Sequence, residues 1–448
     1  MRSKQLLGID SIISLSMPAI LMAMTIIHNV NLLYIVLALG VIRINKPFVI
    51  FPVYFVASLS TGWFAIENGL SAGRFLSLLM IASLLIDLVL NGNLKRFYLN
   101  RKSNNSLNVL LLVFLVYCFM SSLTSLTGEF DAFFMMLQSL CILLLFNLRN
   151  NDDSEILYDL LFYTAIIVII GVSIRTFSEG LSAFMSMRYG SDLAEGVNAN
   201  RIAMMLAQVG AIFGINFLFN GLNPRGFISI VFLLLTSFII ILTGSRTGLI
   251  AILIPFFILI LLMSKGRGLK YIFILLFLFL MVFLAYGWLS SQEVAGLGRM
   301  SVEDVVDTGG ADRMRAIKIM WNDIWPKYPL FGVGLGGANF VEAASQYGMS
   351  HPCHNIFFDS LCQLGLVGFV LFFIIVFTVF MDTFKNVKSA GNNNLLSCLG
   401  ISLMLAGIMN GIGETVYIEK LFWNAITVSV IGNSFVQNMK LFLRNGKI

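Results

Sequence analysis

Apolar runs long enough to cross a lipid bilayer recur along almost the whole of this 448-residue chain. The hydrocarbon core of a bilayer is about 30 Å thick, and a helix of about 20 residues crosses it. Charged residues make up only 12% of the chain, against about 25% in a typical soluble domain. A soluble core could not enclose so many apolar side chains. The sequence therefore predicts an integral membrane protein built from transmembrane helices.

We expect an all-α polytopic fold with about 12–14 transmembrane helices. The first two apolar runs are short and could form a helical hairpin. A polar region divides the chain into N-terminal spans (residues 1–289), a large loop (290–358) and C-terminal spans (359–448). The candidate spans are residues 12–27, 32–43, 48–65, 72–91, 107–126, 133–148, 156–174, 200–220, 227–243, 247–264, 270–289, 360–381, 395–413 and 421–437.

The basic residues indicate the orientation of these spans. With the N-terminus in the cytoplasm, more than half of the 29 Lys and Arg residues fall on the cytoplasmic side, as the positive-inside rule requires. Most of the basic residues on the outer side are arginines. Lys and Arg act alike in setting topology, but only the guanidinium group binds anions in a bidentate manner. We therefore expect both termini in the cytoplasm and an anion-binding surface outside.

Two loops on the outer side are long. The larger one is rich in glycine, and loops of this length are usually either functional or disordered. It contains Trp321 and Trp325, and apolar residues recur with helical spacing over residues 313–325, so we expect helix there. Residues 332–337 fit the Gly-x-Gly-x-x-Gly pattern, but no βαβ pattern precedes them, which favours a turn over a dinucleotide site. The second long loop covers about residues 175–199.

Two arginines stand at predicted helix ends on the outer side. Arg246 follows a glycine turn between two apolar runs, and an arginine at the membrane boundary is costly unless it reaches the headgroups or binds an anion. Arg201 lies at the start of a span that Asn198 or Asn200 could cap. The free N–H groups of a helix N-terminus favour an anion. Both arginines therefore have a structural and an anion-binding interpretation.

Further polar residues on the outer side are equally open. Arg313 and Arg315 begin the helical part of the large loop and could form a solvated face or contact lipid headgroups. Asn410 and Glu414 lie late in the chain, where they could join helices or contact a substrate.

Two of the three histidines, His351 and His354, lie close together near the end of the large loop. A zinc site could use both with Cys353 and Asp359, but their spacing does not resemble a regular zinc site. A histidine here could instead cap the next span. The third interpretation is a general base, because an imidazole with a pKa of about 6.5 transfers protons near neutral pH.

The order of these motifs resembles the O-antigen polymerase and O-antigen ligase superfamily of bacterial inner membranes. The resemblance covers about residues 195–385. The family's arginine before the Pro-Leu-Phe-Gly segment usually follows glycine, whereas Arg313 follows Asp312, so either Arg313 or Arg315 could correspond to it. His351 is an additional histidine, which leaves the choice of imidazole open. The residues that carry the resemblance are Gly244-Ser245-Arg246-Thr247-Gly248, Arg313, Tyr328-Pro329-Leu330-Phe331-Gly332-Val333-Gly334-Leu335-Gly336, His354-Asn355 and Gly365-Leu366-Val367-Gly368.

The resemblance implies a membrane-embedded glycosyltransferase of the type C-like class that uses no metal and no cofactor. Its donor would be a glycan on undecaprenyl pyrophosphate. A polymerase moves the growing glycan onto a new lipid-linked repeat unit, and a ligase moves it onto the lipid A core. A chain-length regulator protein is a further partner that the resemblance implies.

The resemblance also implies roles for individual residues. His354 would take the proton of the acceptor hydroxyl. Arg246, together with Arg201 and either Arg313 or Arg315, would neutralise the departing pyrophosphate, because a guanidinium group stays charged and binds phosphate in a bidentate manner. The remaining candidates for contacts with pyrophosphate or glycan are Asn200, His351, Asn355 and Glu414.

Our leading hypothesis is a polymerase of O-antigen or capsule repeat units in the bacterial inner membrane, with its active site facing the periplasm. An O-antigen ligase is the second hypothesis. A transporter or lipid flippase comes from another class and predicts ionisable residues at mid-membrane depth, of which Asp87 is the clearest. The net charge of +6 does not indicate nucleic acid, because the basic residues lie in short loops between spans.

Overall fold

The computed structural model describes residues 8–59, 64, 71–90, 105–149, 154–178, 199–263, 280, 284, 287, 310–390 and 395–444. These parts of the chain are helices and their connections, without a β-strand. The candidate span at 270–289 lies almost wholly outside the described residues. Most of the loop at 175–199, Asn198 and the first part of the large loop also lie outside them.

Each of the other candidate spans coincides with a helix. Eight of these helices are long and apolar enough to cross a membrane, and four more are apolar but shorter, which confirms the all-α polytopic membrane fold. The helices are α1 (Ile9–Ile26), α2 (Leu32–Ile42), α3 (Pro47–Leu59), α4 (Ala72–Leu90), α6 (Asn105–Leu123), α7 (Asp131–Leu148), α8 (Ser154–Ser178), α10 (Ala199–Asn220), α11 (Pro224–Leu242), α12 (Arg246–Met263), α18 (Ile356–Ala390), α19 (Leu395–Gly411) and α20 (Lys420–Arg444).

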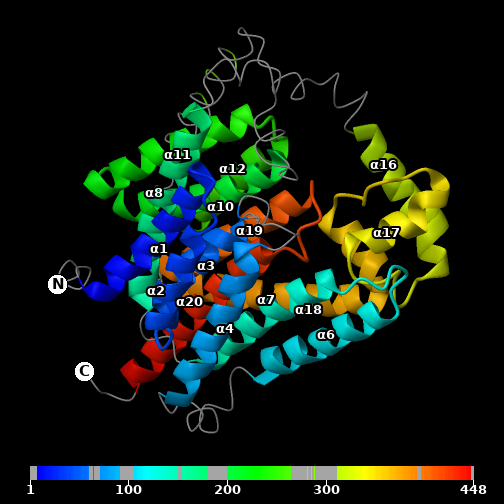
Figure 1. Ribbon diagram of the computed structural model, residues 1–448, viewed down its shortest axis with the longest axis horizontal. Coiled ribbons are helices and arrows are strands. Elements are labelled where there is room, and N and C mark those ends of the chain that lie inside the picture. Colours follow the sequence, from blue (N-terminus) through cyan, green and yellow to red (C-terminus); the bar gives the residue numbers. More distant parts are fainter. Residues whose placement is uncertain are drawn as a thin grey trace.

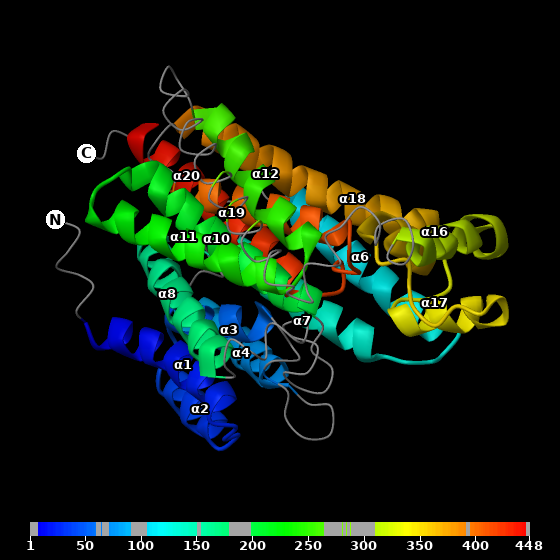
Figure 2. The same cartoon turned by 90° about the horizontal axis from the view of Figure 1, so that it is seen from above.

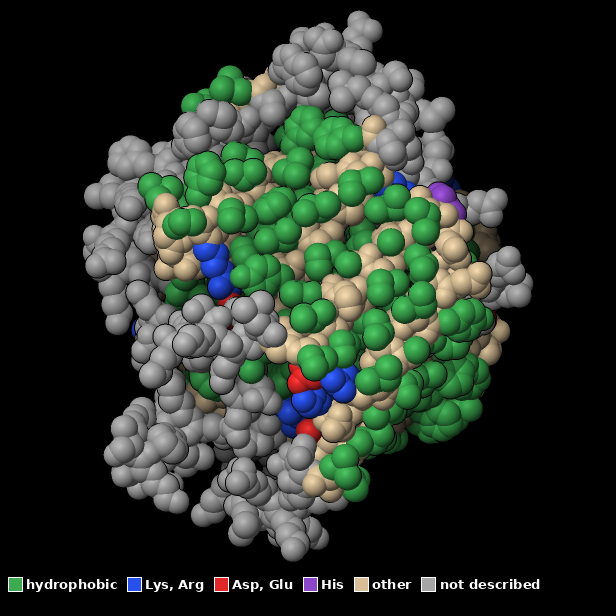
Figure 3. Space-filling model, turned by 60° about the vertical axis from the view of Figure 1, so that its left-hand side comes forward, with side chains coloured by type: hydrophobic (Ala, Val, Ile, Leu, Met, Phe, Trp, Pro, Cys, Tyr) green, Lys and Arg blue, Asp and Glu red, His purple; other side chains and the backbone are tan. Residues whose placement is uncertain are grey.

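The helices pack around two central members, α10 and α20. Helix α10 contacts α8, α11, α12 and α19, and helix α20 contacts α3, α7, α18 and α19. Apolar side chains cover the outward surface of the peripheral helices, for example Val89, Val116 and Phe377. Figure 3 shows one such face, on which the charged side chains form a few small groups within a hydrophobic surface. Lipid solvates such a surface, which would promote aggregation in water.

Part of the large loop forms a small helical unit, which we call the loop module (residues 310–355). It contains α16 (Gly310–Ile319), a π-helical turn (Met320–Ile324), a 3-10 turn (Trp325–Lys327) and α17 (Gly337–Ala344). The helix expected over residues 313–325 is thus confirmed. Ala316, Met320 and Ile324, spaced four residues apart, pack with Phe340 and Cys353 in a buried apolar cluster.

The loop module lies at one end of the molecule. Figure 1 shows α16 and α17 together at this end, and Figure 2 shows α6 and α18 running side by side toward them. Helix α1 begins and helix α20 ends at the opposite end, which we call the far end. At the far end Asp87 pairs with Arg149 at 2.6 Å between Oδ2 and Nε. Asp87 lies three residues before the last residue of α4, so this carboxylate belongs to a paired helix end.

Helix α18 is interrupted at Gly365, whose φ of 62° is left-handed. The segment at residues 329–334, which precedes α17, fills the break. The N–H of Leu366 donates to the carbonyl of Pro329 at 2.9 Å, and the N–H of Gly334 donates to the carbonyl of Gln363 at 3.1 Å. Lipid offers no partner to free backbone groups, so irregular backbone in an apolar helix requires such protein partners. The Gly-rich motif therefore has a structural role: it completes the hydrogen bonds of a broken helix.

Replacing Gly332 with Ala should destabilise the protein strongly. A Cβ atom at Gly332 would lie 2.4 Å from the carbonyl oxygen of Gln363, in addition to the strain of its φ of +72°. Gly128→Ala is the matched control, because Gly128 has a φ of +68° with no atom within 4 Å of its Cβ position. The left-handed conformation alone costs about 1–2 kcal/mol. We expect Gly332→Ala to lower the thermal unfolding midpoint in detergent well beyond Gly128→Ala; equal midpoints would contradict the steric argument.

Candidate functional site

The connection between α19 and α20, residues 412–419, is the point where the predicted site residues meet. Most of it is buried or half-buried, and the side chains of Val416 and Tyr417 are fully enclosed. In Figure 1 this red connection lies between the green helices α10–α12 and the yellow loop module. The N-terminal ends of α10, α12 and α18 all contribute residues that contact it, as the following distances show.

His354 and Glu414 form the central pair. The Nδ1 atom of His354 lies 3.2 Å from Oε2 of Glu414, and the two side chains are 27% and 10% exposed. A carboxylate at Nδ1 orients an imidazole ring and stabilises its protonated form. The second ring nitrogen, Nε2, then remains to exchange a proton with a bound molecule.

Glu414 also connects the pair to two other predicted residues. The side-chain amide of Asn200 donates to Oε1 of Glu414 at 2.7 Å. Burial opposes ionisation of Glu414, but the contact with His354, the hydrogen bond from Asn200 and the positive charge of Arg313 together hold its pKa below the usual value. The structure thus brings Asn200 and His354 into contact with Glu414, and Arg313 lies near enough for its charge to favour the ionised carboxylate.

Other predicted residues bind the same connection at neighbouring positions. Nη2 of Arg201 lies 3.0 Å from Oε1 of Glu419, and the Asn355 side chain donates to the carbonyl of Ile412 at 3.3 Å. Thr247 packs so closely against Gly413 that a Cβ atom there would lie 2.4 Å from its methyl group. Arg246, the residue before Thr247, begins α12 at this same place.

The structure gives the residues of the two alternatives that the sequence left open different surroundings. Arg315 is exposed, and its Nη2 donates to the carbonyl of Tyr347 at 3.0 Å, so it holds the loop module together. Arg313 is the one whose charge acts on Glu414. The Nδ1 atom of His351 lies 3.0 Å from the carbonyl oxygen of Pro352. Its ring stacks on His354 with centroids 5.5 Å apart, so His351 flanks the imidazole that contacts Glu414.

Asp359 is a residue of this site whose role sequence reasoning missed, since we considered it only as a zinc ligand. Its Oδ1 accepts the N–H of Cys353 at 2.9 Å, and its Oδ2 accepts the N–H of Asn355 at 3.0 Å. The hydroxyl of Thr415 donates to the same Oδ2. Asp359 therefore fixes the residues on both sides of His354 and the residue that follows Glu414.

This anchoring explains the backbone of His354, whose φ of 51° is left-handed. A non-glycine residue adopts such a conformation at a cost and keeps it only when its surroundings impose it. The sequence carries a weak signal for the arrangement: Asn355 caps α18, accepting the N–H of Phe357, and Asp359 reaches back to the N–H of Asn355. A carboxylate in the first turn that bonds the capping residue resembles a capping box.

The geometry does not favour the zinc interpretation. Cys353 is packed in the apolar cluster of the loop module, and burial raises the pKa of its thiol. Asp359 already binds two backbone amides. Within the described ranges, no three His, Cys, Asp or Glu side chains are grouped so that they could hold a metal ion.

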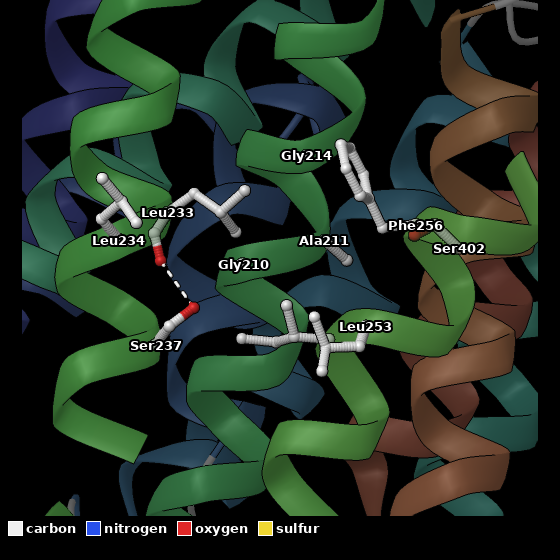
Figure 4. A pocket seen from close by; sticks show the side chains of 10 residues that line it. Gly210, Ala211, Gly214, Leu233, Leu234, Ser237, Leu253, Phe256 and Ser402 are labelled. Atoms are coloured by element: carbon white, nitrogen blue, oxygen red, sulfur yellow. Dashed lines mark hydrogen bonds between the residues drawn. The ribbon is translucent and has the colours of Figure 1, made fainter. Parts of the chain in front are cut away.

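A hollow between α10, α11 and α12 contains none of the predicted residues. Gly210 and Gly214 open it opposite Phe256, and Figure 4 shows the surrounding leucines and the hydrogen bond from Ser237 to Leu233. No ionisable side chain lines it. The group around Glu414 is therefore the candidate site.

Replacing Asp359 with Asn should loosen the backbone around His354. The amide retains one oxygen but loses the charge that strengthens the bonds from Cys353 and Asn355; bonds to charged groups contribute about 1.5–3 kcal/mol each. We expect a loss of about 2 kcal/mol in the free energy of unfolding and faster hydrogen exchange at these two amides. Ser360→Ala is the control, because the Ser360 hydroxyl donates only to carbonyls of its own helix. Unchanged exchange in Asp359→Asn would refute the anchoring role.

The segment from residue 231 to residue 373 matches the family model described as O-Antigen ligase. The match includes Arg246, Arg313, His354 and Asp359, whereas Glu414 lies outside it. A comparison with curated proteins finds no match to the chain. The matched segment contains most of the motifs on which the resemblance in the sequence depends. The match covers about a third of the chain, and it supports the resemblance of this segment to the O-antigen polymerase and O-antigen ligase superfamily.

Proposed function

We propose that this protein polymerises the repeat units of a surface polysaccharide, either O-antigen or capsule. The donor is a glycan on undecaprenyl pyrophosphate, and the acceptor is a new lipid-linked repeat unit. The site faces the periplasm of a bacterial inner membrane, with both termini in the cytoplasm. The observation that carries the proposal is the His354–Glu414 pair at 3.2 Å, with the charge of Arg313 acting on the same carboxylate.

The 3.2 Å separation between His354 and Glu414 supports a role for His354 as general base. Nε2 of His354 takes the proton of the acceptor hydroxyl, while Glu414 at Nδ1 stabilises the imidazolium that forms. The acceptor oxygen bonds to the anomeric carbon of the donor sugar, and the bond from that carbon to the pyrophosphate oxygen breaks. Undecaprenyl pyrophosphate leaves with the electron pair of that bond.

The arginines neutralise the charge that develops on the leaving group. The positive charge of Arg313 acts on Glu414. Arg246 begins α12 next to the connection that carries Glu414. Arg201 is held by Glu419 at 3.0 Å, yet its side chain is 42% exposed and so still offers donors to a ligand. Guanidinium groups keep their charge throughout the reaction, which supports a mechanism without a metal ion.

Transfer to the lipid A core is the second candidate function. The description of the matching family model, O-Antigen ligase, favours it. Both reactions use the same donor, the same base and the same arginines, and they differ only in the acceptor. The acceptor therefore decides between them.

Purified protein should elongate a lipid-linked repeat unit with an undecaprenyl-pyrophosphate donor, in the presence of a strong chelator. His354→Ala should lower the rate at least about 100-fold, the usual contribution of general base catalysis. The control is His28→Ala, because His28 is exposed and has the same φ of 51°. Transfer to lipid A core alone would establish the ligase reaction instead. Full activity of His354→Ala, or no transfer to either acceptor by the unaltered protein, would refute the proposal.

Arg313→Ala and Arg315→Ala remove the same charge two residues apart. Because the charge of Arg313 favours the ionised form of Glu414, we expect its loss to lower kcat/KM for glycan transfer about 100-fold, as for removal of one transition-state donor. Arg315→Ala should stay within a few-fold of the unaltered protein, since Arg315 binds a carbonyl of the loop module. Initial rates at equal donor concentration measure both. A larger loss in Arg315→Ala would reverse the assignment.

A further inference from the structure

The loop module contains an open polar cavity of about 320 Å³. Neither Glu414 nor His354 lines this cavity. It lies between the turn that ends at Lys327 and the C-terminal end of α17, and Leu126 from the connection between α6 and α7 closes one side. A volume of this size is at the lower end of the range for small-molecule sites, about 300–1,000 Å³. The cavity is therefore large enough for a compact ligand of one or two rings.

The polar side chains of the cavity have unused hydrogen-bonding capacity. Those of Asp323, Glu342 and Gln346 make no hydrogen bond or ion pair with any described residue, although all three line the cavity. Lys327 donates to the hydroxyl of Tyr347 at 3.1 Å, which leaves further ammonium protons available. The cavity thus presents acceptors and donors side by side.

This chemistry suits an uncharged polyhydroxylated ring better than an anion. Two carboxylates face one ammonium group, so the net charge of the lining disfavours pyrophosphate and lipid phosphate. Sugar hydroxyls both donate to carboxylates and accept from an ammonium or amide group. Tyr328 adds an aromatic side chain, and a ring face offers apolar contact to the C–H groups of a sugar.

The position of the cavity relative to the reacting bond follows from helix geometry. Arg313 and Asp323 belong to one helical stretch, formed by α16 and the π-helical turn that continues it. Ten residues separate them, so at 1.5 Å per residue the cavity lies about 15 Å along this stretch from the arginine. A glycan whose pyrophosphate rests at the arginine end would extend over the loop module to the cavity.

We propose that the cavity lined by Asp323, Lys327, Glu342 and Gln346 is a carbohydrate subsite that binds sugars of the lipid-linked glycan away from the bond being formed. The inference rests on the proposed function and adds to it the part of the substrate that the loop module recognises. The sugars belong either to the growing chain on the donor or to the acceptor repeat unit, and the two share the same chemistry.

The test uses the full-length protein and a double variant, Glu342→Gln with Gln346→Ala. Both side chains are exposed, so the change should leave the fold intact, which the thermal unfolding midpoint checks. Glu129→Gln is the matched control, because Glu129 is exposed on the connection between α6 and α7 but does not line the cavity. The probe for binding is a lipid-free oligosaccharide. Mild acid releases it from the lipid-linked intermediates of the bacterium that produces this protein.

The double variant should bind this oligosaccharide at least about ten-fold more weakly than the unaltered protein, the effect of losing one or two hydrogen bonds. Glu129→Gln and His354→Ala should bind it normally. In the transfer assay, the double variant should raise KM about ten-fold with kcat unchanged. A rise in KM for donors with long glycans assigns the subsite to the growing chain, and a rise for the acceptor assigns it to the repeat unit; either supports the inference.

Two outcomes separate this inference from the proposed function. If the unaltered protein transfers glycan and the double variant matches it in binding and KM, the subsite is refuted and the function stands. If the unaltered protein transfers no glycan but binds the oligosaccharide through Glu342 and Gln346, the proposed reaction is refuted and the subsite stands. Equal binding of the oligosaccharide to the unaltered protein and the double variant overturns the subsite in every case.

Discussion

A buried carboxylate, that of Glu414, organises the end of the protein that carries the loop module. A buried charge is unstable unless positive or hydrogen-bonding groups compensate it. The compensating groups come from three separate parts of the chain: Asn200 from α10, Arg313 from α16 and His354 from the start of α18. Satisfying one carboxylate therefore brings the start of α10 and the start of α18 together, with the positive charge of Arg313 acting on the same carboxylate.

Irregular backbone gives this meeting point its precision. Asp359 holds the amides on both sides of His354, and the break at Gly365 lets the Gly-rich segment join the loop module to α18. In an apolar environment each unpaired backbone group costs several kcal/mol, so these bonds fix one arrangement. The strained φ of His354 is maintained in the same way. The site is thus held by backbone hydrogen bonds as much as by its charged side chains.

The two ends of the molecule use charge differently. At the far end, acidic and basic residues form close pairs such as Asp87–Arg149 and Asp159–Arg225, each at 2.6 Å. At the end with the loop module, Arg201 remains partly exposed, although it is paired with Glu419. The match of residues 231–373 to the O-Antigen ligase family model fits our proposal that the arginines receive the pyrophosphate of a lipid-linked glycan while the loop module receives the sugars.

The sequence by itself determined the membrane fold, because hydrophobicity over about 20 consecutive residues is a local property that fixes where a helix crosses lipid. It also indicated His354, Arg246 and Arg201, because charged residues are rare in such a chain and their few positions are informative. The preference for Arg313 over Arg315 and for His354 over His351 depended on the tertiary structure, since His354 contacts Glu414 and the charge of Arg313 acts on it. His354 and Glu414 are far apart in the sequence, and no local pattern records that contact. The same holds for Asp359, because its anchoring role depends on the tertiary contact between the start of α18 and Thr415.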